Sequence, residues 1–479
     1  MSLRQKTFTG LYWSFLSQGA RQGVQFVIVV ILAQLLSPDD FGLLAMAVVF
    51  TEFAAMFVDM GIGQALIQKQ DATDDHYCSA FWLNVGLGLT LMLLVAGLSP
   101  LIAWFYRQPQ LQPVVAVLSF NFIFSSLTVV QQSRWMKEME FRKLAMRDIV
   151  AVVLAGVVGI GLARAGFGVW SLVAQSLSLA AVNAAVMWRL SPWRPKFIFS
   201  LDCIKDIVRF SAHMTGFNVV NYLARNTDKL LIGRFLGSEA LGLYALAYKL
   251  MMLAVENISW VVGKVMFPAF AKIQQDLDHV RRIYVRMVKS VALLTFPLMG
   301  WLFVLAPEIV RVLFGPQWLA TIVLIRIFCL CGMAQSLTTL GGTIYMSRGR
   351  PDIQWKMSVM NFILVAVSIA LGLRGGIAAV TWAYSLFHVV WLLVALTVVS
   401  RLIRLDAVVL YRHVSFVFAL NVVWLAMLWG VKPWLTQGHD EFIVLALGVI
   451  GTALYGGLLM ATRQVKWENG RIVFVFEVT

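Results

Sequence analysis

The chain has 479 residues, of which 60% are hydrophobic and only 13% charged, and its formal net charge is +15. A soluble globular protein carries about 25% charged residues, so this composition excludes a soluble domain of such a length. The apolar runs are continuous rather than alternating, which predicts an all-α integral membrane protein and excludes a β-barrel.

The apolar runs predict about 14 transmembrane helices, because about 20 apolar residues cross the hydrocarbon core of a bilayer. In chain order they cover residues 12–36, 41–61, 80–106, 111–133, 146–164, 168–189, 206–236, 241–262, 287–308, 318–346, 357–373, 376–400, 411–430 and 441–462. The segment that precedes them lacks a small-residue cleavage site, so we expect a retained entry helix and not a secretory signal.

Two segments of the chain that lie 200 positions apart resemble each other. Residues 33–48 read AQLLSPDDFGLLAMAV, residues 233–248 read GRFLGSEALGLYALAY, and Gly42 coincides with Gly242. One internal repeat in so apolar a chain is typical of transporters built from two related halves. We therefore expect two pseudo-symmetric six-helix lobes, over residues 1–200 and 201–404, followed by two additional helices and a tail over 405–479.

The basic residues determine the expected orientation of the helices. Most of the 39 Lys and Arg lie in one set of loops, and the opposite set holds Arg107, Arg164, Arg311, Arg374 and Lys432. Loops rich in Lys and Arg stay in the cytoplasm, so we expect both termini there. The same distribution accounts for the positive charge of the chain, and we expect no nucleic-acid partner.

Polar residues share one face of the first predicted helix in each lobe. In the first lobe the stripe includes Gln18, Arg21 and Gln25, and in the second it includes Asn218, Asn221, Tyr222, Arg225 and Lys229. Charged residues inside a membrane usually line a water-filled cavity, and Arg binds phosphate oxygens with a planar fork of donors. These residues therefore predict a cationic lumen for an anionic substrate. The alternative, in which Asp228 pairs with Arg225 and only stabilises the helix, stays open.

Acidic residues inside the predicted helices are few. We name four of them as candidate residues for coupling transport to H⁺ or Na⁺: Glu52, Asp59, Asp228 and Glu256. Carboxylates at membrane depth serve this role in ion-coupled transporters. They can equally pair with the lumen arginines, and the sequence does not decide between these roles.

The chain shows no motif of a catalytic or metal site. Its Gly pairs are not followed by Lys-Ser or Lys-Thr, and its six His form no HExxH arrangement and no cluster of Cys and His. We therefore expect no catalytic residue, no metal and no cofactor other than a coupling ion.

Several motifs resemble those of the Wzx-type polysaccharide flippases of the MOP superfamily, which also contains MATE antiporters, and the resemblance is nearest to the colanic acid exporter branch. These motifs are Phe41-Gly42-Leu43, Asp59-Met-Gly61-Ile-Gly63-Gln64, Asp228-Lys-Leu-Leu-Ile-Gly233, Leu241-Gly242-Leu-Tyr244, Phe267-Pro268-Ala269-Phe270 and Phe314-Gly315. The resemblance covers about the first 400 residues and is only generic in the last two helices.

The resemblance implies a flippase in the bacterial inner membrane. It would move undecaprenyl-diphosphate-linked oligosaccharide repeat units, of an exopolysaccharide or O-antigen, to the periplasmic leaflet by alternating access. A polysaccharide polymerase and a chain-length regulator are its implied partners besides membrane lipids. Two alternatives remain: a MATE-type cation-coupled multidrug antiporter, for which an acidic lumen is expected, and a membrane-embedded polysaccharide polymerase, for which large periplasmic loops are expected.

Overall fold

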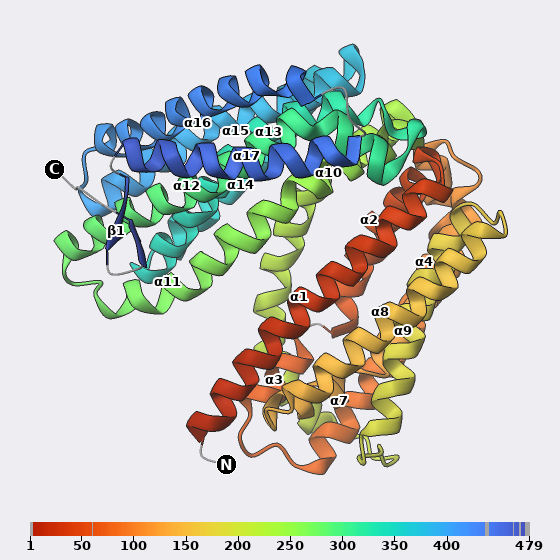
Figure 1. Cartoon of the computed structure of the whole chain (residues 1–479). Coiled ribbons are helices and arrows are strands. Elements are labelled where there is room, and N and C mark those ends of the chain that lie inside the picture. The colour runs from red at the N-terminus through yellow and green to blue at the C-terminus, as the bar shows by residue number, and fades with distance from the viewer. Residues whose placement is uncertain (1–2, 60, 436–439, 463, 469–470, 475–479) are drawn as a thin grey trace. The chain divides into compact units, whose positions relative to one another are not determined.

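The apolar runs of the sequence form helices along almost all of the described chain (Figure 1). The computed structural model describes residues 3–59, 61–435, 440–462, 464–468 and 471–474. Within these ranges it does not describe the side chains of residues 3–17, 59, 206–221, 224, 254, 260, 441 and 465–474. The described helices form two compact units, and the boundary between the units in the sequence lies between Gly242 and Leu243.

The first unit contains nine helices and most of a tenth. They are α1 (Leu3–Leu35), α2 (Pro38–Asp59), α3 (Ile62–Gln68), α4 (Asp74–Tyr106), α5 (Leu111–Leu118), α6 (Asn121–Ser126), α7 (Val129–Lys137), α8 (Phe141–Arg164), α9 (Val169–Leu190) and α10 (Leu201–Val255), which changes direction at Gly237 (φ 87°). Helix α8 runs alongside α9 and also packs against α1, and Figure 1 shows α8 and α9 side by side. Apolar side chains such as Leu32 and Val152 fill the contact between α1 and α8.

The turn between α1 and α2 shows why the chain breaks where it does. Ser37 and Asp40 form a capping box: the Asp40 N–H donates to the Ser37 hydroxyl at 3.2 Å, and the Ser37 N–H donates to the Asp40 carboxylate at 3.0 Å. Pro38 is the first helical residue of α2, a position where its missing N–H costs nothing. These local signals end one apolar helix and begin the next.

The predicted span over residues 111–133 is not one continuous helix. Residues 111–133 form a continuous apolar run, but the structure divides the segment among α5, α6 and α7. At the breaks, the Ser119 and Thr128 hydroxyls donate to the carbonyls of Ala116 and Ser125, three residues back. Such side-chain bonds compete with the helical ladder and favour tight turns, so the span is interrupted without Gly or Pro.

The second unit starts in the last part of α10 and contains the remaining elements. They are η1 (Glu256–Trp260, a π-helix), α11 (Val261–Lys272), α12 (Leu277–Ile309), η2 (Val310–Phe314, a π-helix), η3 (Pro316–Trp318), α13 (Thr321–Ser347), α14 (Pro351–Gly372), η4 (Leu373–Gly375), α15 (Gly376–Ile403), α16 (Ala407–Leu435), α17 (Asp440–Ala461) and the antiparallel strands β1 (Val465–Glu468) and β2 (Arg471–Phe474). Helix α13 lies between α12 and α15, and α16 packs against α12 and α17.

The two copies of the repeat meet at their glycines, inside the first unit. A Cβ atom on Gly42 would overlap the Ser238 carbonyl oxygen, and a Cβ atom on Gly242 would overlap the Pro38 carbonyl oxygen. Pro38 and Ser238 are themselves equivalent positions of the repeat. The contact is therefore the same from either side, as a pseudo-twofold relation between the copies requires. The Ser238 hydroxyl also donates a hydrogen bond to the Asp39 carboxylate.

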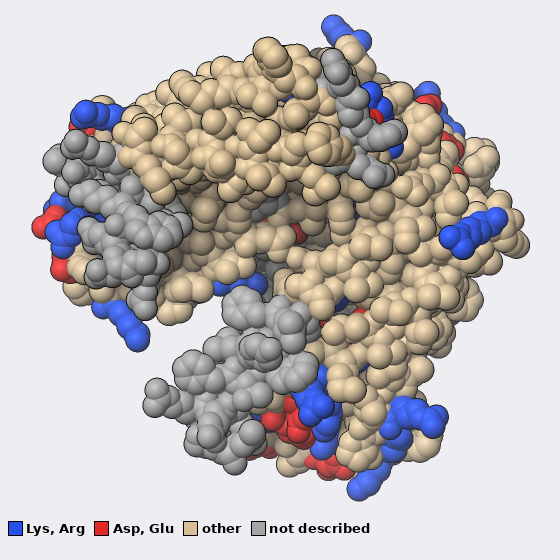
Figure 2. Space-filling model, in the orientation of Figure 1, with Lys and Arg blue, Asp and Glu red and all other residues tan. Residues whose placement is uncertain are grey.

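The described chain has the surface of a multi-pass membrane protein. Eleven of its helical runs are long and apolar enough to cross a bilayer. Two of these runs, Arg225–Lys272 and Pro351–Ile403, each contain two helices that the sequence predicts as separate spans, and the number of 14 stays a prediction. In Figure 2, Lys, Arg, Asp and Glu gather mainly near helix ends, and the helix flanks between them are largely uncharged. The all-α membrane fold expected from the sequence is thus confirmed.

Candidate transport site

Arg21 is the first predicted lumen residue that the structure places. It lies on α1, and its guanidinium Nη1 is 3.6 Å from Oδ2 of Asp148 on α8. The Arg21 side chain is 53% exposed and that of Asp148 is 23% exposed. An ion pair with this exposure is weak, and the guanidinium can still present N–H donors to a ligand.

A second arginine shares the same carboxylate. Arg147 is buried, and its Nη2 donates to Oδ1 of Asp148 at 2.6 Å. Its Nη1 donates to Oε1 of Gln132 on α7 at 3.1 Å. Two guanidiniums around one carboxylate leave this cluster with a net positive charge.

Neither Arg147 nor Gln132 is among the lumen residues predicted from the sequence. Arg147 comes at the start of an apolar run and reads as a loop residue. Gln132 belongs to the pair Gln131-Gln132 inside the run 111–133, and that polar pair is the signal that singles it out.

On α10, the predicted lumen residue Tyr222 faces the predicted ion-coupling residue Glu52 of α2. The Tyr222 hydroxyl donates to the carbonyl of Val49 at 2.8 Å and lies 3.4 Å from Oε2 of Glu52. Its ring lies 6.0 Å from that of Phe53. The first unit therefore holds a carboxylate and a phenol within hydrogen-bond distance, on two helices that are 170 positions apart in the sequence.

The polar face of α10 continues one turn further through Asn226. Its side-chain amide donates to the Tyr222 carbonyl at 3.1 Å, and its Oδ1 accepts a hydrogen bond from Nζ of Lys229 at 3.0 Å. The Arg225 side chain is exposed, whereas Asp228 is buried, and its Oδ1 accepts the Lys229 backbone N–H at 2.8 Å. The exposed Arg225 and the half-buried Lys229 therefore follow Tyr222 within two turns of the same helix.

The remaining predicted residues fall into two groups. Gln18 and Gln25 are exposed on α1, on the same polar stripe as Arg21. The side chains of Asn218, Asn221 and Asp59 lie outside the described part of the structure. Glu256 begins the π-helix η1 in the second unit, where it interacts electrostatically with Lys249, two turns earlier.

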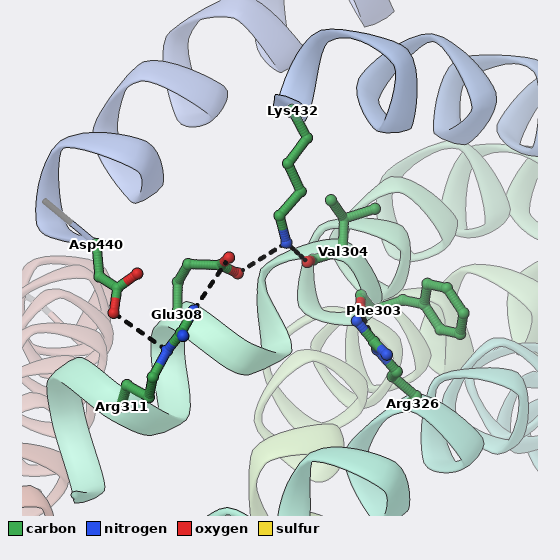
Figure 3. A network of polar contacts seen from close by, with 7 residues as sticks. All are labelled: Phe303, Val304, Glu308, Arg311, Arg326, Lys432 and Asp440. Atoms are coloured by element: carbon green, nitrogen blue, oxygen red, sulfur yellow. Dashed lines mark hydrogen bonds and ion pairs between the residues drawn. The ribbon is translucent and has the colours of Figure 1, made fainter. Parts of the chain in front are cut away.

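The second unit contains a charged network of a different kind (Figure 3). Glu308 of α12 is buried, and it accepts from Nζ of Lys432 on α16 at 2.9 Å and pairs with Arg311 at 3.5 Å. Arg311 also pairs with Asp440 of α17 at 3.1 Å. Nearby, the Arg326 guanidinium lies over the Phe303 ring, 5.6 Å from its centre. Each acid here is paired with a cation, so this network ties α16 to α12 and α17 to η2.

The chain also resembles known proteins. The polysaccharide biosynthesis protein family matches residues 31–323. The teichuronic acid biosynthesis protein TuaB of Bacillus subtilis is 29% identical over 90% of each chain. The lipopolysaccharide biosynthesis protein WzxC of Escherichia coli K12 is 30% identical over 81% of this chain and 80% of its own. The succinoglycan biosynthesis transport protein ExoT of Rhizobium meliloti is 30% identical over 66% of this chain and 64% of its own.

Among solved structures, the lipid II flippase MurJ in an inward closed conformation has the same fold, with a TM-score of 0.76 at 14% identity over 95% of this chain and 99% of its own. An inward-facing multidrug resistance MATE family transporter of the MOP superfamily has a TM-score of 0.60 at 16% identity over 80% of this chain and 98% of its own. The fold implied by the sequence motifs is thereby confirmed. The family match covers more than half of the chain, and WzxC shares 30% identity over four fifths of it. The chain therefore belongs to the polysaccharide biosynthesis protein family.

Proposed function

We propose that this protein is a flippase for lipid-linked oligosaccharides. It moves undecaprenyl-diphosphate-linked repeat units of a surface polysaccharide from the cytoplasmic to the periplasmic leaflet by alternating access. Family membership carries the proposal: the chain belongs to a polysaccharide biosynthesis family, and its described part consists almost entirely of membrane helices in the fold of a lipid flippase. Such a chain contributes to polysaccharide synthesis most directly by moving an intermediate, because its described loops are short.

The chemistry of the first unit supports an anionic cargo. Arg21 is half-exposed beside a carboxylate that it shares with Arg147, so the surface around it is net positive. A guanidinium keeps its charge at all physiological pH values and matches the oxygens of a phosphate group. We assign Arg21 and the exposed Arg225 to binding the diphosphate of the lipid carrier. A multidrug antiporter for cationic compounds would need the opposite sign of charge at this position.

The Glu52–Tyr222 pair is our candidate for ion coupling. A carboxylate that faces a phenol in a membrane protein can bind and release a proton, or bind sodium with neighbouring oxygens, as the substrate cavity opens to either side. Asp228, Glu256 and Asp59 are further candidates. We propose that the gradient of H⁺ or Na⁺ drives the cycle through one or more of these carboxylates.

The setting of this function is the bacterial inner membrane, with both termini in the cytoplasm. A polysaccharide polymerase and a chain-length regulator are the expected partners on the periplasmic side. The protein itself makes and breaks no covalent bond in this proposal.

The direct test uses purified protein in liposomes that contain a diphosphate-linked oligosaccharide with a fluorescent sugar. A membrane-impermeant quencher reports the fraction of label in the outer leaflet, so flipping appears as a time-dependent change in quenching. We expect flipping with the unmodified protein and not with empty liposomes. Equal rates in both would refute the proposal, and transport of a cationic dye instead would favour the antiporter.

A further inference from the structure

The first unit has a cavity apart from the polar faces described above. It measures about 510 Å³ and lies where the end of α4 meets α10, lined by Pro100, Trp104, Arg107, Gln108, Gln112 and Arg234 among others. Two of these residues are cations and two are side-chain amides. Neither Arg107 nor Arg234 takes part in the candidate transport site.

Arg234 is the residue that most needs a ligand here. Its Nη1 is buried and has no hydrogen-bond partner among the described residues. Its guanidinium lies over the ring of Phe105, 5.7 Å from the ring centre, which stabilises the charge but supplies no hydrogen-bond acceptor to Nη1. A buried N–H of a charged group without a partner is costly, so an anionic acceptor in the adjoining cavity would satisfy it.

Arg107 is held at the mouth of the same cavity by the turn that ends α4. It adopts a left-handed backbone conformation (φ 57°), and its N–H donates to the Trp104 carbonyl at 3.1 Å. The next residue, Gln108, donates from its side chain to the Ser238 hydroxyl on α10 at 3.4 Å. This hydrogen bond holds the turn against α10, and Arg107 and Arg234 line the same cavity. Non-Gly residues seldom adopt this conformation, so the turn fixes the arginine at some conformational cost.

The surface leading to the cavity is apolar and exposed. Leu94, Leu98 and Leu101 recur at helical spacing on α4 and are exposed, and the Trp104 side chain beyond them is 72% exposed. In a membrane helix such a face contacts acyl chains, and an exposed Trp at its end marks the headgroup level. The charge distribution of the loops assigns Arg107 to the periplasmic side.

The geometry points to a binding site for the phosphate headgroup of a lipid in the periplasmic leaflet, with Arg107 and Arg234 as the phosphate ligands and the α4 leucines along the acyl chain. Gln108 and Gln112 supply further donors to headgroup oxygens. The shared chemistry is a lipid-borne phosphate, whose source is either an anionic phospholipid or the diphosphate of the lipid carrier. Binding of a phosphate lipid at this site does not require the proposed flipping to be correct, because an anionic phospholipid carries the same chemical group.

The test is native mass spectrometry of the full chain in detergent with three added lipids. These are dioleoylphosphatidylglycerol, undecaprenyl diphosphate and, as a lipid without phosphate, dioleoylglycerol. We expect the unmodified protein to retain one or both phosphate lipids and not dioleoylglycerol. Arg107→Asn suits the turn, because Asn tolerates the left-handed conformation, and Arg234→Gln keeps a planar donor. Each should reduce binding by about tenfold, the value of one charge-assisted hydrogen bond.

Arg164→Gln is the matched control, because it removes a cation from another turn on the same expected side of the first unit. Arg234→Lys, which keeps the charge but not the fork, should restore part of the binding and shows that the site is folded. The lipid whose retention falls in the pocket variants identifies the source. Unchanged binding in the Arg107→Asn/Arg234→Gln double variant, or an equal loss in Arg164→Gln, would overturn the proposal.

Discussion

At the scale of single residues, Arg21 combines a permanent positive charge with a half-exposed side chain. Its ion pair with Asp148 is partly exposed, whereas the pair of Arg147 with Asp148 is buried and shorter. The two arginines therefore have different roles around one carboxylate. Arg147 holds α8 against α7 through Gln132, and Arg21 is available to a ligand.

Arg21→Gln should reduce export of surface polysaccharide by about tenfold, because one charge-assisted contact to the substrate is lost. The protein should insert and fold normally, since the Arg147–Asp148 pair stays intact. The measurement is surface polysaccharide in cells that carry only the variant, normalised to its level in the membrane. Arg164→Gln is the control for loss of a cation, and export at the unmodified level in Arg21→Gln would remove Arg21 from the site.

The Glu52–Tyr222 pair yields a prediction about coupling. Tyr222→Phe removes the hydroxyl that faces Glu52 and keeps the ring contact with Phe53. Loss of this hydrogen bond should cost about 1 kcal/mol of stability, and the dependence of flipping on the ion gradient should weaken. Glu52→Gln should abolish that dependence. The gradient dependence of both variants is measured as the flipping rate in liposomes with and without an imposed H⁺ or Na⁺ gradient. An unchanged gradient response in Glu52→Gln would exclude Glu52 as the coupling residue.

At the scale of elements, α2 and α10 approach each other closely at Gly42 and Gly242. A methyl group at either glycine would overlap a backbone carbonyl, so the helices have to separate to accept it. Gly42→Ala and Gly242→Ala should each destabilise the protein by about 1–3 kcal/mol, the usual cost of overpacking. Thermal unfolding in detergent measures the effect.

Gly97→Ala is the control for this prediction, because Gly97 lies within α4 and a Cβ atom there meets nothing within 4 Å. It should leave the unfolding temperature unchanged or raise it slightly, since Ala is the better helix former. Equal unfolding temperatures for Gly42→Ala, Gly242→Ala and Gly97→Ala would show that the crossing is looser than the structure has it.

The sequence predicted the helices better than it predicted which helices pack against one another. Periodicity alone predicts that Gln18, Arg21 and Gln25 share one face, because this depends only on helical geometry. It did not reveal that Tyr222 would face Glu52, since the neighbour across a helix contact depends on packing between distant segments. The division of residues 111–133 was also missed, because the Ser and Thr bonds that interrupt the span are weak local signals in an apolar run.

At the scale of the whole molecule, the last two helices are linked to the rest of the second unit by the charged network around Glu308. Its side chain is 4% exposed, and it serves both Lys432 and Arg311. Glu308→Gln leaves these cations without their shared partner, so it should destabilise the protein by about 3–5 kcal/mol. The Glu308→Gln/Lys432→Met double variant should be less destabilised than Glu308→Gln. Thermal unfolding of the double variant and of its two single variants compares their stabilities. A double variant that is as unstable as the sum of its single changes would show that the pair is not coupled.

The orientation of the chain was inferred from loop charges alone and makes a separate prediction. Both termini should lie in the cytoplasm, so a phosphatase reporter fused after Thr479 should be inactive and one inserted at Arg374 should be active. Composition and the distribution of Lys and Arg were enough to predict a membrane fold, because the bilayer restricts a chain this apolar to helices. Activity of the reporter after Thr479 would contradict an even number of crossings.

If the protein moves a lipid-linked oligosaccharide across the membrane, its depletion from cells should change the fate of that lipid. We expect the diphosphate-linked repeat unit to accumulate in the cytoplasmic leaflet while surface polysaccharide is lost. Normal surface polysaccharide, together with increased sensitivity to cationic dyes, would instead indicate a multidrug antiporter.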